Sequence, residues 1–430
     1  MDVIRPAREI GAELRGARCR ARLTQAQVGN AVGYSPSAVS RIEAGRMRLE
    51  FDRLMRFAAF LSIPPNRLTG TPVPGGVALD TVERPADEED AVRRRNLLTG
   101  ALAAGATAAF GASPASAVSG AGDPAAGLED VLFRLPSAAP VPLARLVQEA
   151  ASARADFCAA RYTALGRVLP GLLAAASATR DASTGRAREK ASIVLARTYV
   201  LAAELALKQH SDAAWAAADR ALTAARASGH PVPIGESSRV LAITMRRSGS
   251  CTSAVRLLTK EAADLDTSQE QTGAVRTTLM LTGAYSAATG GDRMTALDLL
   301  NAAEEEADRR AAVPGLFTVD ATRTQVDVYR IGVFNALGTP DEGVSVARRI
   351  DIDMMSTPER RARAWTDTAR MWHALGDGPQ TFAALQRVEE EAPQEVRRPA
   401  LRALTANLLY APARVPGVRQ FAARTGAIPA

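Results

Sequence analysis

The stretch that decides the fold of the first part of the chain is LTQAQVGNAVGYSPSAVSRIEAG, residues 23–45. Thr24 is suited to cap the N-terminus of the segment QAQVGNAV, and Gly33 provides a C-terminal stop for that helix. Ser35 is suited to cap the helix that follows, with Pro36 at its first position. We therefore predict two short helices joined by a tight glycine turn.

Helices on either side complete a small domain. Residues 7–19 place Ile10 and Leu14 at helical spacing, which predicts a first helix. Residues 49–61 supply a further helix, and the segment PPNRLTG, residues 64–70, closes the unit. The first 70 residues are therefore expected to form a compact helical domain.

The exposed face of the second predicted helix of the turn carries polar groups. Val39 and Ile42 share its apolar face, whereas Ser37, Ser40 and Arg41 lie on the other. These features resemble the lambda-repressor-like, or XRE, family of helix-turn-helix proteins. The resemblance rests on Leu14-Arg15, Leu23-Thr24-Gln25, Gly33-Tyr34-Ser35, Ser40-Arg41-Ile42-Glu43-Ala44-Gly45, Leu54, Leu61 and Leu68. It implies a five-helix DNA-binding domain, and it departs from the family at Gly29, where alanine is usual.

The resemblance also implies roles for individual residues. Gln25 would fix the docking register on a phosphate, and Arg41 would read a guanine in the major groove. Arg18 and Glu43 match a structural pair that joins the first helix to the end of the third. The DNA-binding candidates are Gln25, Ser35, Ser37, Ser40, Arg41, Arg46 and Arg48.

The charge distribution agrees with a polyanionic partner for the N-terminal domain. Residues 1–70 contain 12 Arg against 6 Asp plus Glu, a net charge of +6, whereas the whole chain carries +7. The basic excess is therefore an N-terminal property, and double-stranded DNA is the expected partner.

Residues 71–140 are rich in Pro, Gly, Ala and Ser and are predicted to be a linker. Within it, RRRNLLTGALAAGATAAFGASPASA, residues 93–117, resembles a twin-arginine export signal. Signal peptides are N-terminal, and this segment follows a DNA-binding domain, which argues against export. A linker or packing helix is the favoured interpretation, and peripheral or inserted membrane attachment is the alternative.

Residues 141–430 alternate apolar helical stretches with short turns, which predicts an all-α repeat array. Three segments are each predicted to form a helix, a short turn and a second helix, a pattern that resembles tetratricopeptide repeats. They are residues 196–225, 281–307 and 365–392. Turn markers at Gly249, Gly291, Gly338 and Gly376 are 42, 47 and 38 residues apart. This spacing exceeds the about 34 residues of an ideal repeat, so the repeats are degenerate. We expect about five or six helix pairs, beginning near residue 142, with residues 401–426 as the terminal cap.

Such an array leaves a concave groove lined by the first helix of each pair. Its candidate effector contacts are Arg197, Arg246, Arg276, Tyr285, Arg323 and Arg330. The layout resembles the peptide-pheromone receptors of Gram-positive bacteria and, with its segment after the DNA-binding domain, actinomycete regulators. The pheromone receptors often read a peptide backbone with asparagines, whereas this region has only Asn301, Asn335 and Asn407, which argues against the same mode of peptide binding. The candidate effectors are therefore a peptide, a small molecule or a protein.

Chemistry-bearing motifs give no support for an enzyme. Phosphate-loop, dinucleotide and zinc-protease motifs are missing, and the three histidines have no metal-ligand spacing. The acidic runs at residues 304–306 and 389–391 are interpreted as solvated helix faces. The three cysteines lie far apart, which indicates reduced thiols. No catalytic residue, metal or cofactor is therefore assigned.

Taken as a whole, the sequence predicts a cytoplasmic, homodimeric transcriptional regulator. Dimerisation is assigned to the repeat domain, because one helix-turn-helix unit covers only a half-site. The alternative is a membrane-associated or protein-binding tetratricopeptide scaffold that retains a helix-turn-helix domain.

Overall fold

The computed structural model describes residues 7–63, 68, 123–309, 313–410 and 415–428, except residues 22, 46, 48, 62 and 126. Within these ranges every regular element is a helix and none is a strand. The predicted all-α fold, with an N-terminal helix-turn-helix domain and a C-terminal helical repeat, is confirmed. The predicted linker segment 93–117 lies outside the described residues.

The N-terminal domain is built on the predicted turn. Its described helices are α1 (Ala7–Arg20), α2 (Gln25–Val32), α3 (Pro36–Glu43) and α4 (Phe51–Phe60). Residues from all four helices, together with Leu68, meet in one apolar core. A fifth helix, which the family resemblance implies, would have to follow α4, where most of residues 64–70 lie outside the described part of the chain.

Local hydrogen bonds explain where these helices begin and end. The Thr24 hydroxyl accepts from the Gln27 amide at 3.2 Å, and the Gln27 side chain accepts from the Thr24 amide at 2.8 Å. This reciprocal capping box starts α2. Gly33 ends α2 with a φ of 78°, which an L side chain rarely adopts. The Ser35 hydroxyl then accepts from the Ala38 amide and starts α3. The predicted caps are confirmed.

Gly29 allows α2 to approach the turn closely. A Cβ at this position would lie 2.2 Å from the backbone carbonyl oxygen of Tyr34. Such a contact is far shorter than van der Waals distance, so the turn here is tighter than an alanine permits. The glycine at position 29 is therefore part of the local packing.

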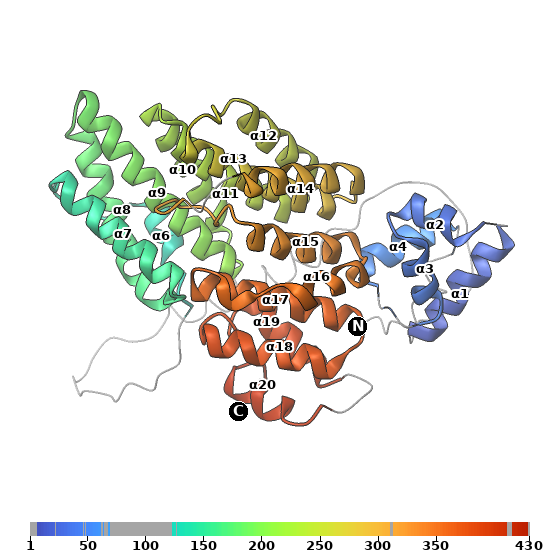
Figure 1. Cartoon of the computed structure of the whole chain (residues 1–430). Helices are drawn as coiled ribbons and strands as arrows, with labels where there is room; N and C mark the ends of the chain where they lie inside the picture. The colour runs from blue at the N-terminus through green and yellow to red at the C-terminus, as the bar shows by residue number, and fades with distance from the viewer. Residues whose placement is uncertain are drawn as a thin grey trace, which may run out of the picture. The chain divides into compact units, whose positions relative to one another are not determined.

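The C-terminal part is a series of helical hairpins that runs from α7 to α20 (Figure 1). Its α-helices are α6 (Leu128–Phe133), α7 (Leu143–Cys158), α8 (Tyr162–Asp181), α9 (Gly185–Gln209), α10 (Ala213–Ser228), α11 (Pro231–Arg247), α12 (Cys251–Ala263), α13 (Glu270–Thr289), α14 (Arg293–Asp308), α15 (Arg323–Leu337), α16 (Val344–Arg349), α17 (Pro358–Ala374), α18 (Gly378–Glu391), α19 (Pro399–Leu408) and α20 (Val418–Arg424). Six pairs, α7/α8 to α17/α18, precede the shorter α19/α20 pair in the described residues. The predicted first pair and terminal cap occur where expected.

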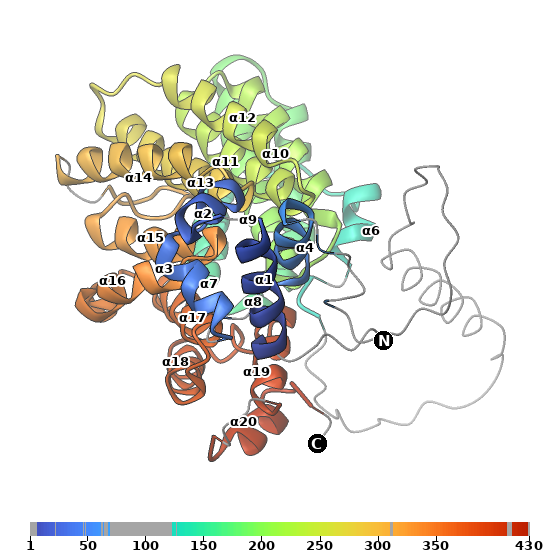
Figure 2. The same cartoon turned by 90° about the vertical axis from the view of Figure 1, so that its right-hand side faces the viewer.

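The two helices of each pair lie in different layers. From α7 to α17, successive odd-numbered helices contact one another, and each also contacts its even-numbered partner. Figure 2 shows α11, α13, α15 and α17 on the inner side and α12, α14, α16 and α18 on the outer side. This is the layered arrangement expected of a tetratricopeptide-like solenoid.

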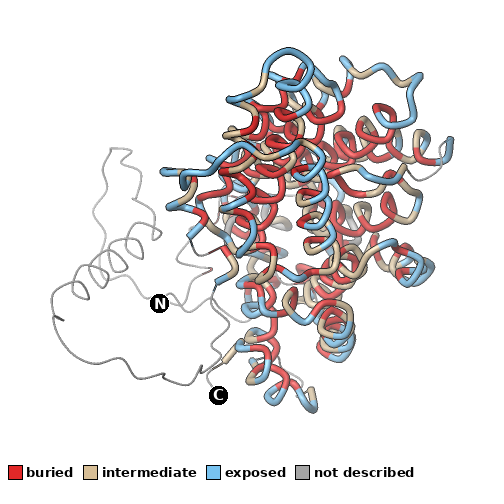
Figure 3. The backbone as a smooth tube through the Cα atoms, turned by 90° about the vertical axis from the view of Figure 1, so that its left-hand side faces the viewer, coloured by how far each residue is buried: buried red, intermediate tan, exposed pale blue. Residues whose placement is uncertain are grey.

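Small side chains let the two layers approach. Ala203 and Ala206 on α9, and Ala217 and Ala221 on α10, are fully buried. Figure 3 shows such buried positions concentrated on the facing sides of the helices. Apolar burial between neighbouring helices is therefore the main stabilising interaction of the array.

The four predicted turn glycines all adopt left-handed backbone conformations. Their φ angles are 84° at Gly249, 83° at Gly291, 71° at Gly338 and 79° at Gly376. The prediction that these residues mark the turns between paired helices is confirmed.

The array begins earlier than the sequence suggested. Residues 123–140 were assigned to the linker, but this range contains α6, and Ala125, Leu128 and Leu132 belong to the main core of the array. α6 is only six residues long, so its apolar pattern is too short to stand out from a Pro- and Ala-rich background. The structured C-terminal region therefore includes residues before 141.

Candidate nucleic-acid interface and effector groove

A polar cluster fixes α1, α2 and α3 relative to one another. Arg18 on α1 donates from Nε to Glu43 Oε1 at 2.5 Å and from Nη2 to Glu43 Oε2 at 3.0 Å. Arg18 also donates to the Leu23 carbonyl oxygen at 2.9 Å. The expected contact between Arg18 and Glu43 is thus present, and it holds α1 against the end of α3.

Gln25 belongs to the same cluster. Its side-chain amide donates to Glu43 Oε2 at 2.9 Å. The sequence interpretation assigned this amide to a DNA phosphate, whereas here its nitrogen is engaged inside the domain. The backbone amides at the start of α2 are the groups of this segment that suit a phosphate.

Burial raises the pKa of Glu43, but the hydrogen bonds from Arg18 and Gln25 outweigh it, so the pKa lies below the ordinary glutamate value. The carboxylate is therefore charged at neutral pH and acts as an acceptor for both partners. This cluster therefore joins α1, α2 and the end of α3.

The remaining DNA-binding candidates are distributed around α3. Ser35 caps the helix, Ser40 is exposed, and Arg41 lies in the last turn. Ser37 lies on α3, but its side chain is outside the described residues, as are Arg46 and Arg48 entirely.

In the array, the inner helices line a large groove. Its walls come from α9, α11, α13, α15, α17 and α19, as predicted for the first helix of each pair. On α11 the lining residues Arg239, Ile243 and Arg246 follow a helical repeat, and on α17 Arg360 and Arg363 do the same. The lining is rich in arginine.

The predicted groove residues fall into two groups. Arg246 and Tyr285 line the groove, and so do Asn335 and Asn407. The other four arginines do not line it and form ion pairs on neighbouring helices. These pairs are Arg197–Glu236 (2.9 Å), Arg276–Glu306 (2.8 Å), Arg323–Asp308 (3.0 Å), Arg323–Glu304 and Arg330–Glu304.

The two acidic runs are also more structured than expected. Glu304 accepts from arginines of α15, and Glu391 pairs with Arg361 at 2.7 Å. Only the central residue of each run, Glu305 or Glu390, is mostly exposed. The solvated-face interpretation is therefore wrong for the outer members of both runs, because the partner helix of the same pair or a helix of the next pair brings an arginine within reach.

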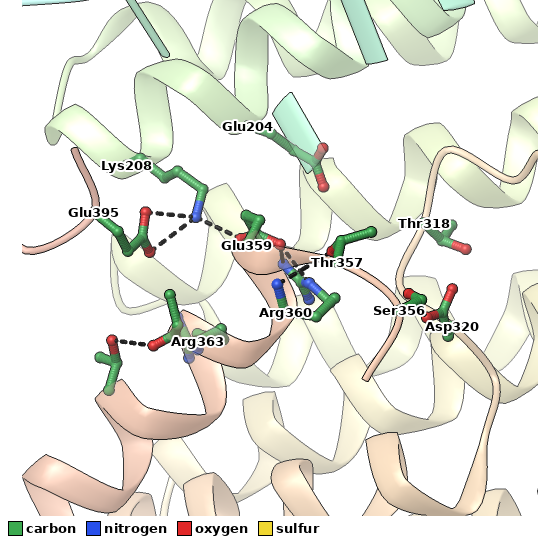
Figure 4. Close-up of polar contacts among 12 residues, drawn as sticks. Glu204, Lys208, Thr318, Asp320, Ser356, Thr357, Glu359, Arg360, Arg363 and Glu395 are labelled. Atoms are coloured by element: carbon green, nitrogen blue, oxygen red, sulfur yellow. Dashed lines mark hydrogen bonds and ion pairs between the residues drawn. The ribbon is translucent and has the colours of Figure 1, made fainter. Parts of the chain in front are cut away.

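A buried cluster ties distant parts of the array together (Figure 4). Lys208 on α9 donates from Nζ to Glu359 on α17 at 2.6 Å and to Glu395 at 3.1 and 3.2 Å. Tyr162 on α8 donates its hydroxyl to Glu395 at 2.6 Å. Arg360 forms an ion pair with Glu359. The first two helix pairs are thereby joined to α17 and to the segment before α19.

The environment keeps this cluster ionised. Burial raises the pKa of Glu359, but Arg360 and Lys208 overcome this effect and hold the pKa well below the ordinary value. Burial likewise opposes ionisation of Glu395, whose pKa is lowered by its cationic neighbours Arg398 and Lys208. Burial and the nearby carboxylates raise the pKa of Tyr162 well above its usual range, so its hydroxyl keeps its proton. The cluster therefore consists of charged pairs around a neutral tyrosine.

Sequence reasoning missed Lys208, Glu359 and Glu395. The one available signal was that Lys208 and Glu204 lie one turn apart in the apolar C-terminal half of α9, where charged groups need partners. The partners could not be named, because they lie 151 and 187 residues away.

Within the part of the chain that the structure describes, no helix is long and apolar enough to span a membrane. The segment 93–117, on which the membrane interpretation rests, is outside that part.

Comparison with known proteins gives a match in the N-terminal domain. No curated protein matches the chain. Among solved structures, the chain is similar to PlcR of Bacillus thuringiensis in complex with the peptide PapR7 and DNA. The TM-score is 0.31 and the identity is 12%, over 88% of this chain and 99% of that chain. Residues 9–68 match a family described as a helix-turn-helix domain, and this range coincides with the domain formed by α1 to α4.

Proposed function

We propose that this protein is a sequence-specific DNA-binding transcriptional regulator of the XRE type, with an actinomycete layout. Residues 1–70 bind an operator, the segment after them links the domains, and the array binds an effector, mediates dimerisation, or does both. The observation that carries the proposal is the family match over residues 9–68, together with the capped α2–turn–α3 geometry. Because its target is chromosomal DNA, the protein acts in the cytoplasm.

α3 is the proposed recognition helix. Arg41 contacts a guanine, with Ser37 and Ser40 beside it on the same helix. Arg46 and Arg48 contact the phosphate backbone, and Gln25 and Ser35 lie at helix starts, where backbone amides favour phosphate. The Arg18–Glu43 pair supports this arrangement by fixing α1 against α3.

The test uses the full chain and an operator selected from random DNA. Arg41→Ala is expected to weaken operator binding by about 1–3 kcal/mol and to relax one base position, since a bidentate guanine contact is lost. Arg46→Ala serves as the matched arginine variant. It is expected to weaken binding to all DNA sequences equally. The slope of log affinity against log salt concentration is expected to become shallower by about one unit, because one phosphate contact is lost.

Fluorescence anisotropy at several salt concentrations measures both effects. Unchanged affinity of Arg41→Ala for the selected operator, or absence of DNA binding by the full chain, would contradict the proposal.

The protein is proposed to act as a homodimer. Two half-sites about 34–36 Å apart are the usual target of such domains, and the array offers the larger helical surfaces for association. Sedimentation of the full chain, with and without operator DNA, measures the assembly. A monomer in both conditions would exclude dimerisation.

The groove of the array is the proposed effector site. Arg246 and Tyr285 are its proposed contacts among the lining residues. Arg197, Arg276, Arg323 and Arg330 would act on an effector only by exchanging their present ion pairs.

A further inference from the structure

Arg246 differs from Arg239, Arg360 and Arg363, which line the same groove and each pair with a carboxylate. Its guanidinium lies 4.5 Å from the centre of the Tyr285 ring and approaches the Ser286 hydroxyl at 3.5 Å. Among the described residues it forms no ion pair with a carboxylate. The nearby cations Arg363 and Arg239 act on its pKa, and each of them is paired with a carboxylate of its own. A partly buried cation without a carboxylate partner is unfavourable unless an anion joins it.

A second arginine of the same helix has the carboxylate partner that Arg246 lacks. Arg239, two turns before Arg246 on α11, pairs with Glu204 at 3.0 Å and hydrogen-bonds Tyr329. Burial lowers the pKa of Arg239, but its partners more than compensate, so the pKa is raised. Burial also lowers the pKa of Arg246, and there the effect is not compensated. The two residues differ in what pairs with them.

An unpartnered amide lies on the wall of the same groove. Gln325 on α15 is fully buried, and neither atom of its side-chain amide has a hydrogen-bond partner among the described residues. It lines the groove one helical turn before Tyr329, whose ring packs edge-on against Tyr285 at 6.4 Å. A buried polar group without a partner costs free energy, and a ligand that hydrogen-bonds it removes that cost.

We propose that the groove binds its effector through an anionic oxygen group, a carboxylate or a phosphate, held by the guanidinium of Arg246. Tyr285 orients the guanidinium by stacking, so that its free edge can donate two parallel hydrogen bonds to the anion. Gln325 donates to and accepts from a polar group elsewhere on the ligand. This inference rests on the proposed role of the groove as the effector site.

Isothermal titration of the full chain tests the site with two probes, inorganic phosphate and succinate, in a chloride buffer of constant ionic strength. The wild type is expected to bind at least one probe, and the preferred probe identifies the anion as phosphate or carboxylate. Arg246→Met is expected to weaken that probe by about tenfold or more, because a charge-assisted pair of hydrogen bonds is lost.

Arg276→Met is the matched control. It removes the same charge from an inner helix, but Arg276 is paired with Glu306 and does not line the groove. Its probe affinity is expected to equal that of the wild type. Gln325→Leu is a second variant, expected to keep the melting temperature of the ligand-free protein, because the residue has no partner to lose.

Binding of neither probe to the wild type, or equal affinities of Arg246→Met and the wild type, would overturn the inference. Operator binding without any probe is measured on the same samples. If the wild type binds DNA and no anion, the proposed anion site is refuted and the proposed regulatory function is retained. If it binds an anion and no DNA, the proposed regulatory function is refuted and the proposed anion site is retained.

Discussion

The helix-turn-helix domain and the repeat array are both stabilised by polar contacts, but the partners are much farther apart along the sequence in the array. In the domain, the tie between Arg18 and Glu43 spans 25 residues. In the array, the tie between Lys208 and Glu359 spans 151 residues, and that between Tyr162 and Glu395 spans 233. The contact in the domain lies within a motif that is visible in the sequence. The two contacts in the array join parts of the array that are not neighbours along the chain.

This difference matters because repeat arrays are usually stabilised by nearest-neighbour contacts. Here α17 also contacts α7, and the Lys208 cluster joins the second pair to the sixth. We therefore expect this array to unfold more cooperatively than a chain of independent repeats.

The largest expected effect comes from Lys208→Met. The substitution leaves Glu359 and Glu395 buried without their shared cation, which costs about 3–5 kcal/mol of unfolding free energy. Urea unfolding followed by tryptophan fluorescence measures it, since all three tryptophans lie in the array. Lys190→Met on the same helix is the control, because Lys190 is exposed. An effect no larger than that of the control would show that the Lys208 cluster contributes nothing to the unfolding free energy.

Acid should weaken the array through the same cluster. The pKa values of Glu359 and Glu395 are lowered in the folded state. Their stabilisation is therefore complete above the unfolded value of about 4.3 and is lost as the pH falls through the folded values. Each carboxylate contributes a slope of up to about 1.4 kcal/mol per pH unit. Urea unfolding at pH values below 5 should show this loss in the wild type and a shallower one in Lys208→Met; equal slopes would refute it.

A smaller effect is expected in the N-terminal domain from Glu43→Gln. The amide keeps the shape but loses the charge that accepts from Arg18 and Gln25, at a cost of about 1.5–3 kcal/mol. Hydrogen exchange of the α1 to α3 amides in the full chain measures the local stability. Glu305→Gln, on an exposed array position, should leave that exchange unchanged. Equal exchange in both variants would mean that the pair does not stabilise the domain.

The smallest expected effect is that of Gly29→Ala, at about 1–3 kcal/mol, because the new Cβ would clash with the Tyr34 carbonyl oxygen and the turn must open. The control is Gly171→Ala on α8, where no heavy atom lies within 4 Å. That change is expected to stabilise the array by about 0.5–1 kcal/mol, since alanine is the better helix former. Thermal unfolding and hydrogen exchange distinguish the two. A tolerated Gly29→Ala would show that the turn adapts freely.

Much of the architecture was predictable because its signals are local. The caps at Thr24 and Ser35 and the stop at Gly33 lie within a few residues of the bonds they make. The turn glycines from Gly249 to Gly376 likewise depend on backbone conformation alone. The α6 segment was missed because it is only six residues long, and so short an apolar pattern becomes informative only when its packing partners are known.

The sequence by itself determined most of the helical elements, the turn of the N-terminal domain and the alternation of paired helices, since caps, glycines and apolar periodicity act over one or two turns. Only the tertiary structure decided which charges meet. It placed Lys208 between two glutamates, paired Arg276 and Arg330 outside the groove, and left Arg246 inside it without a carboxylate. The physical reason is that an ion pair depends on distance in space, and helix packing sets that distance between residues that no sequence interval relates.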